Sequence, residues 1–74
     1  MRTILDQFII VIKGKQMKYV LQKRGGQDFA VRVERGNAIR KGVSIHSFYD
    51  REPEALKSFE QLRQRFQSKG VEFI

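Results

Sequence analysis

The sequence predicts an α+β domain: a small antiparallel sheet of about four strands, followed by one amphipathic helix. Apolar and polar residues alternate through much of residues 3–49, and glycine-containing turns separate the alternating segments. From about residue 52 to 69 the apolar spacing changes to three and four, the period of a helix. A chain of 74 residues has enough apolar surface to form only one core. We therefore expect one domain, with the sheet over about 3–49, the helix over about 52–69 and a short tail strand over 71–74.

The central hairpin is the clearest element. Two alternating segments flank Gly25-Gly26, a pair suited to the positive φ angles of a primed hairpin turn. One face of this hairpin is predicted to be apolar and to receive the helix, through Met17, Tyr19, Leu21, Phe29, Val31 and Val33. The opposite face is predicted to be polar and basic.

The outer strands are predicted on either side of the hairpin. The first runs from about Phe8 to Lys13 and turns at Gly14-Lys15. After a turn at Gly36-Asn37, a fourth strand lies within residues 38–49. Lys41 interrupts its inward-facing apolar series, so a bulge or short loop is expected at Gly42. That inward series is Ile39, Val43 and Ile45.

Residues Ile9 to Ile12 are apolar on both faces of their strand, a pattern typical of strands that are covered on both sides. The helix can cover only one side. Either long Lys and Arg side chains shade the other side, or a second copy of the protein covers it. Because a core of this size leaves only ~3–5 kcal/mol of net stability, we expect a homodimer.

The helix has a predicted start, end and buried face. Glu52, Pro53 and Glu54 suit its first turn, and Gly70 suits a left-handed cap after its last residue. The stripe expected to pack on the sheet is Leu56, Phe59, Leu62 and Phe66.

The charge distribution points to a polyanionic partner. The chain has 15 Lys or Arg and 8 Asp or Glu, a net charge of +7. Residues 1–49 carry ten basic and three acidic residues, whereas residues 50–74 carry five of each. Such an asymmetry favours a small nucleic-acid-binding protein that contacts phosphates through the basic sheet face. The competing explanation is a solvated surface, on which lysines keep strand edges unpaired.

The candidate interface combines basic groups on the outer sheet face and its turns with one aromatic residue on which a base could stack. Tyr49 and His46 are weaker aromatic candidates. The predicted nucleic-acid-binding residues are Lys13, Lys15, Lys18, Lys23, Arg24, Arg32, Arg35, Arg40, Lys41 and Phe48.

No residue pattern indicates catalysis. The chain has no cysteine and one histidine, His46, so a nucleophile–base pair or a metal site lacks its usual residues, and we expect no enzyme, metal or cofactor. Asp50, Glu52 and Glu54 fit the start of the helix instead. The absence of cysteine favours a reducing, cytoplasmic setting. The apolar run from Phe8 to Ile12 is far shorter than the ~20 residues that cross a bilayer, and no targeting segment is expected.

Four antiparallel strands followed by one helix, with a basic sheet face, resemble the architecture of groups of single-strand-binding proteins that include the Whirly and Pur proteins. The resemblance covers the order of elements and no residue motif. It implies single-stranded DNA or RNA as the ligand. The alternative function is a small homo-oligomeric interaction or regulatory module that docks an acidic protein partner. The extended apolar tail at residues 71–74 favours that alternative, unless it completes the protein's own sheet.

Overall fold

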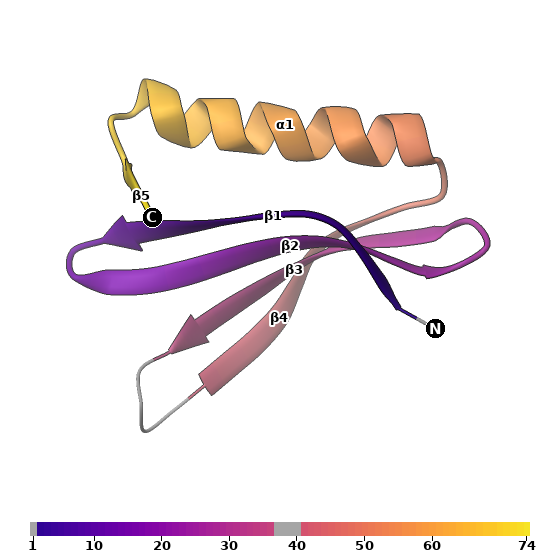
Figure 1. Cartoon of the computed structure of the whole chain (residues 1–74), viewed down its shortest axis with the longest axis horizontal. Coiled ribbons are helices and arrows are strands. Elements are labelled where there is room, and N and C mark those ends of the chain that lie inside the picture. Colours follow the sequence, from indigo (N-terminus) through magenta and orange to yellow (C-terminus); the bar gives the residue numbers. More distant parts are fainter. Residues whose placement is uncertain (1, 37–40) are drawn as a thin grey trace.

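The computed structural model describes residues 2–36 and 41–74, except for the side chain of residue 41. An antiparallel sheet with strand order β4-β3-β2-β1-β5 carries the helix on one face (Figure 1). This arrangement confirms the predicted α+β class. The elements are β1 (Thr3–Ile12), β2 (Lys15–Gly25), β3 (Asp28–Gly36), β4 (Lys41–Tyr49), α1 (Glu52–Ser68) and β5 (Glu72–Phe73).

The core lies between α1 and one face of β1, β2 and β3. The Phe8 ring stacks on Tyr19 at 5.1 Å and an interplanar angle of 11°, and it also lies 5.1 Å from the ring of Phe59. Burial of each such side chain stabilises the fold by about 1.5–3 kcal/mol. The core residues are Phe8, Ile10, Tyr19, Leu21, Phe29, Val31, Val33, Ala55, Phe59 and Leu62.

The buried stripe of α1 is rotated from the predicted one. Leu56 was predicted to pack on the sheet, but it is 43% exposed, whereas Ala55 is fully buried. Neighbouring helical residues point ~100° apart, so only one of these two can face the sheet. The small Ala55 side chain occupies that position at the start of α1. Phe59 and Leu62 are buried as predicted, and Phe66 packs against the core from a partly buried position.

The turns of the first two hairpins differ from the predicted ones: the first lies at Lys13-Gly14 rather than Gly14-Lys15, and it has the primed geometry that was predicted for the second. Lys13 and Gly14 have φ angles of 52° and 76°, which are the positive values of a primed turn, so β1 ends at Ile12 rather than Lys13. The predicted primed turn at Gly25-Gly26 is wrong, because neither glycine has a positive φ. Instead, the β2–β3 register shifts between Lys23 and Gly25, which leaves one extra residue in β2. This bulge increases the local strand twist, which a turn without positive φ angles does not supply.

Strand β1 is longer than predicted, because it begins at Thr3 rather than Phe8. A register shift between Ile4 and Asp6 interrupts its pairing with β2. That irregularity disrupts the alternation on which the sequence-based boundary depended.

Strand β4 departs most from expectation. Its bulge lies at His46, between the pairs Val31↔Ser47 and Arg32↔Ile45, and not at Gly42. Val43 and Ile45 face away from the helix and are 60% and 39% exposed, so their predicted inward orientation is wrong. The bulge position depends on pairing with β3, which the local sequence does not reveal. Ile39 lies outside the described residues.

The end of α1 and the tail form as expected. Gly70 has a φ of 73°, and its backbone N–H donates to Gln67 O at 3.1 Å. Val71 N–H donates to Phe66 O at 3.1 Å, which completes a Schellman-type cap. Strand β5 then pairs with β1, with Phe73 opposite Ile10. The tail therefore completes the protein's own sheet.

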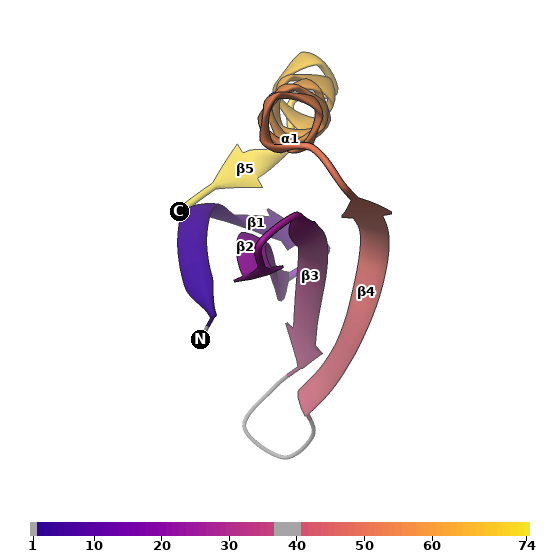
Figure 2. The ribbon, with the colours of Figure 1, turned by 90° about the vertical axis from the view of Figure 1, so that its right-hand side faces the viewer.

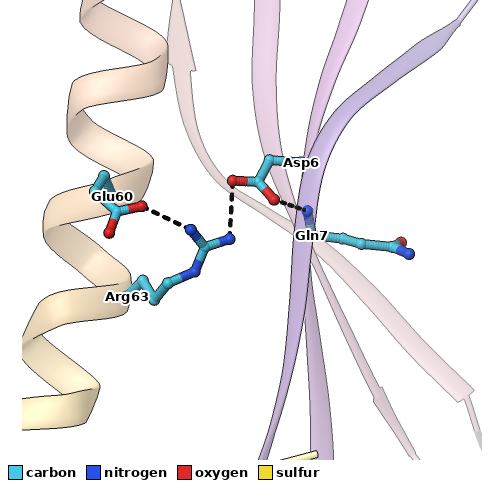
Figure 3. A network of polar contacts seen from close by, with 4 residues as sticks. All are labelled: Asp6, Gln7, Glu60 and Arg63. Atoms are coloured by element: carbon cyan, nitrogen blue, oxygen red, sulfur yellow. Dashed lines mark hydrogen bonds and ion pairs between the residues drawn. The ribbon is translucent and has the colours of Figure 1, made fainter.

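An ion-pair network ties α1 to β1 (Figure 3). Arg63 donates to Asp6 Oδ2 at 2.8 Å and to Glu60 Oε2 at 2.6 Å. Its guanidinium carbon also lies 5.4 Å from the ring centroid of Phe8 and 5.6 Å from that of Phe59. Burial lowers the pKa of Arg63, but the hydrogen bonds and charges of the two carboxylates outweigh burial, so the pKa is raised above its ordinary value.

Candidate nucleic-acid interface

The predicted interface lies on the open face, which is the face of the sheet opposite α1. Pairing across β1, β2, β3 and β4 arranges its side chains in cross-strand rows. Figure 2 shows β1 and β4 on either side of β2 and β3. The three central rows are Ile4, Gln22, Ala30 and Phe48; Gln7, Val20, Arg32 and Ile45; and Ile9, Lys18, Glu34 and Val43.

The open face is mixed in character, which corrects the prediction of a polar and basic surface. Val20 and Ala30 are completely buried although α1 lies on the other side of the sheet. In the cross-strand rows, Gln7 and Arg32 flank Val20, and Gln22 and Phe48 flank Ala30. Ile4, Val43 and Phe48 are apolar and more than half exposed at 55%, 60% and 62%.

The two basic residues at the centre of the open face are both paired. Glu34 Oε2 lies 4.0 Å from Lys18 Nζ, and Glu34 Oε1 lies 3.5 Å from Arg32 Nη2. Glu34 is directly opposite Lys18 in the β2–β3 register and follows Arg32 by two residues on the same face. The pairing reduces the local charge from +2 to +1. Arg32 Nε is buried and has no hydrogen-bond partner among the described residues.

The sequence analysis did not place Val43 or Glu34 in the candidate site, because their positions depend on the β4 bulge at His46 and on the pairing of β3 with β2. Ile9 and Val43 line the same groove as Lys18 and Glu34, but Val43 was assigned to the core. Glu34 was not included in the candidate site, because its position between two cations depends on pairing between strands. The spacing of Arg32 and Glu34 within β3 was the only local signal for their contact.

A groove of about 200 Å³ opens on the open face at the end where β1 turns into β2 and β3 ends. Its lining is Ile9, Gln16, Lys18, Glu34, Arg35, Gly36 and Val43. Lys13 lies in the adjoining turn and Lys15 begins β2 directly after it, and both are exposed. Among the described residues, no acidic group lies within 4.0 Å of the charged groups of Lys13, Lys15 or Arg35.

Three other predicted residues lie at the opposite end of the sheet. The Arg24 guanidinium carbon is 5.7 Å from the Phe48 ring centroid, and Arg24 Nε is 3.8 Å from Asp28 Oδ2. Lys23 Nζ lies 5.8 Å from the centroid of Phe29, a core residue on the helix side. Phe48 lines a hollow together with three carboxylate residues, Asp28, Asp50 and Glu54. This end is therefore less suited to phosphate than the groove end.

The predicted residues thus divide into groups. Lys18 and Arg35 line the groove, although Arg35 shares the helix-facing alternation of Val33, and Arg32 lies in the next row of the open face. Lys13 and Lys15 lie in and next to the β1–β2 turn at the same end of the sheet. Lys23, Arg24 and Phe48 lie at the other end. Arg40 lies outside the described residues. Residue 41 begins β4, but its side chain also lies outside them.

Tyr19, a core residue on the helix side of the sheet, and His46 beside it have defined surroundings. Burial raises the pKa of Tyr19 from 10.0, although the charge of Arg35 opposes this shift, so the phenol is neutral at pH 7. The exposed His46 ring lies 6.3 Å from the ring of Tyr19, and its Nδ1 is 3.2 Å from Ser47 Oγ. Within residues 2–36 and 41–74, no group of three His, Asp or Glu side chains is placed to hold a metal ion.

Comparison with known protein families, with curated proteins and with solved structures found no match to this chain. The likeness to the Whirly and Pur proteins therefore depends on the order of elements alone. In the described part of the chain, no helix combines the length and apolar character needed to cross a membrane.

Proposed function

We propose that this protein binds single-stranded nucleic acid at the groove end of the open face. The observation that carries the proposal is the separation of charge between the layers. Residues 50–74, which contain the helix, have no net charge, and residues 1–49, which form the four long strands, have a net charge of +7. Lys18 and Arg35 line the groove, and Lys13 and Lys15 lie in and next to the β1–β2 turn; within residues 2–36 and 42–74, Lys13, Lys15 and Arg35 have no acidic partner within 4.0 Å.

In this proposal the basic groups hold the sugar–phosphate backbone, and their affinity comes from release of condensed counterions. The apolar side chains of Ile9 and Val43 provide contacts for unpaired bases. The mixed character of the groove favours single strands, because only unpaired bases expose apolar faces. Reading of a duplex major groove has no support, since the one helix packs its apolar stripe on the sheet.

We also propose that the protein is non-catalytic, acts without a metal or cofactor, is a homodimer and works in the cytoplasm. His46 is the only histidine of the chain, and the sequence contains no cysteine. The lack of cysteine also suits a reducing compartment. A dimer would add buried area to a domain whose single core is small.

A charge-reversal pair tests the proposed interface. Lys13→Glu/Lys15→Glu is expected to weaken binding to single-stranded DNA or RNA at least ~10-fold and to lower the salt slope by about two, because two phosphate contacts are lost. Fluorescence anisotropy over a salt series measures both quantities. Lys57→Glu/Arg65→Glu is the matched control, since it makes the same change in net charge at exposed positions of α1. An equal loss in both variants would contradict a localised interface.

A second candidate function, docking of an acidic protein partner, is favoured by the exposed apolar side chains beside the cations of the open face. Ile4, Ile45 and Phe48 resemble the apolar part of a protein interface more than a surface for phosphates alone. Failure of the protein to bind any nucleic acid at low salt would make this second candidate the stronger one.

A further inference from the structure

Strand β4 is an edge of the sheet, and its sequence does little to protect it. Between Gly42 and Tyr49 it contains no Lys, Arg, Asp, Glu or Pro, the residues that usually prevent edges from pairing with other chains. After its first residue, Lys41, the strand is uncharged, in a chain with a net charge of +7. Its outward backbone groups are therefore available to another strand without local charge repulsion.

The other edge of the sheet is protected in two ways. Strand β5 covers part of β1 by pairing with Ile10 and Val11, and Ile74 N–H donates to Ile9 O at 3.0 Å. The remaining part of β1 contains the register shift between Ile4 and Asp6, which interrupts a regular edge. A partner strand thus has a better template at β4.

The bulge at His46 places three exposed apolar side chains of β4 on one face. Val43 and Phe48 are five residues apart and would face opposite sides of a regular strand. Because the bulge inserts one residue between them, both lie on the open face with Ile45. They are 60%, 62% and 39% exposed, so a partner strand would cover them.

We propose that β4 pairs antiparallel with β4 of a second copy of this chain, about a two-fold axis near Ile45 and His46. The register that sets Val43 opposite Phe48 of the second copy keeps both residues on the open face and brings the two bulges together at the axis. The same register sets residue 41, a lysine at the first position of β4, opposite Asp50 of the second copy at both ends. A two-fold contact of this kind closes as a dimer.

The proposed dimer extends the sheet through its edge, and of the residues that line the groove it involves Val43, the one that β4 supplies. It does not depend on nucleic-acid binding, and it differs from a dimer in which two open faces pack together. A face-to-face dimer would bury Ile4 on β1 as well as Val43 on β4. Of these two residues, an edge-to-edge dimer would bury only Val43.

Sedimentation of two matched variants separates these arrangements. The wild type is expected to sediment at about twice the chain mass at micromolar concentration, and Val43→Lys is expected to be a monomer. Ile4→Lys, which makes the same kind of change at an exposed residue of the same face, is expected to remain a dimer. A monomeric wild type would overturn the proposal, and so would loss of the dimer in both variants.

Engineered cysteines test the register, because the natural chain has none. Val43→Cys/Phe48→Cys is expected to form a disulfide-linked dimer on mild oxidation, since opposite residues lie within disulfide reach. Val43→Cys alone is expected to form far less, because its two copies would be about five residues, or ~17 Å, apart along the strands. Both positions are exposed, so the substitutions should preserve the fold. Equal cross-linking of the single and double variants would overturn this register.

Discussion

Phe59→Ala is expected to abolish cooperative folding. Phe59 is 1% exposed, and its ring packs on Phe8 at 5.1 Å in the centre of the interface between α1 and the sheet. Truncation of a buried Phe costs about 3–5 kcal/mol, which equals the whole net stability expected of so small a core. Thermal unfolding followed by far-ultraviolet circular dichroism should show no cooperative transition.

Leu56→Ala is the control for this prediction. Both side chains belong to the apolar spacing of the helix, but Leu56 is 43% exposed. Its truncation is expected to change the free energy of unfolding by no more than ~0.5 kcal/mol. If the two variants melted at the same temperature, the placement of α1 on the sheet would be wrong.

Arg63→Ala is expected to lower the free energy of unfolding by about 1–2 kcal/mol. The substitution removes two charge-assisted hydrogen bonds and the packing of the guanidinium against two core rings. The effect is moderated by solvent, because the side chain of Asp6 is 37% exposed. For a domain of this size the loss corresponds to a melting temperature about 5–15 °C lower.

Arg65→Ala provides the comparison, since Arg65 is an exposed residue two positions further along α1. It removes the same charge and should shift the melting temperature by no more than a few degrees. A similar shift in both variants would mean that the Asp6–Arg63 contact does not contribute to stability.

The sequence predicted the elements well because their periodicities are local. Alternation in β2 and β3 and the three–four spacing of α1 gave the order of strands and helix, and Gly70 forms the expected cap. The orientation of α1 was less predictable, since Ala55 and Leu56 are both compatible with a helical apolar face. Only contact with the sheet decides which of them is buried.

The candidate site was less predictable because it depends on register. The sequence identified Lys18 and Arg32 as neighbours on one face, which the pairing bears out. It gave no indication that Glu34 lies between their charges, or that a bulge at His46 turns Val43 onto the same surface. Both features result from pairing between strands. The charge excess of the sheet layer, in contrast, follows directly from composition.

A salt titration of wild-type binding decides whether this protein binds single-stranded nucleic acid. Labelled single-stranded DNA, single-stranded RNA and duplex DNA would be compared by fluorescence anisotropy from ~50 to ~200 mM salt. The proposed function predicts a linear fall of log K with log salt and tighter binding of a single strand than of the duplex. Absence of binding to all three at the lowest salt, or a preference for the duplex, would contradict it.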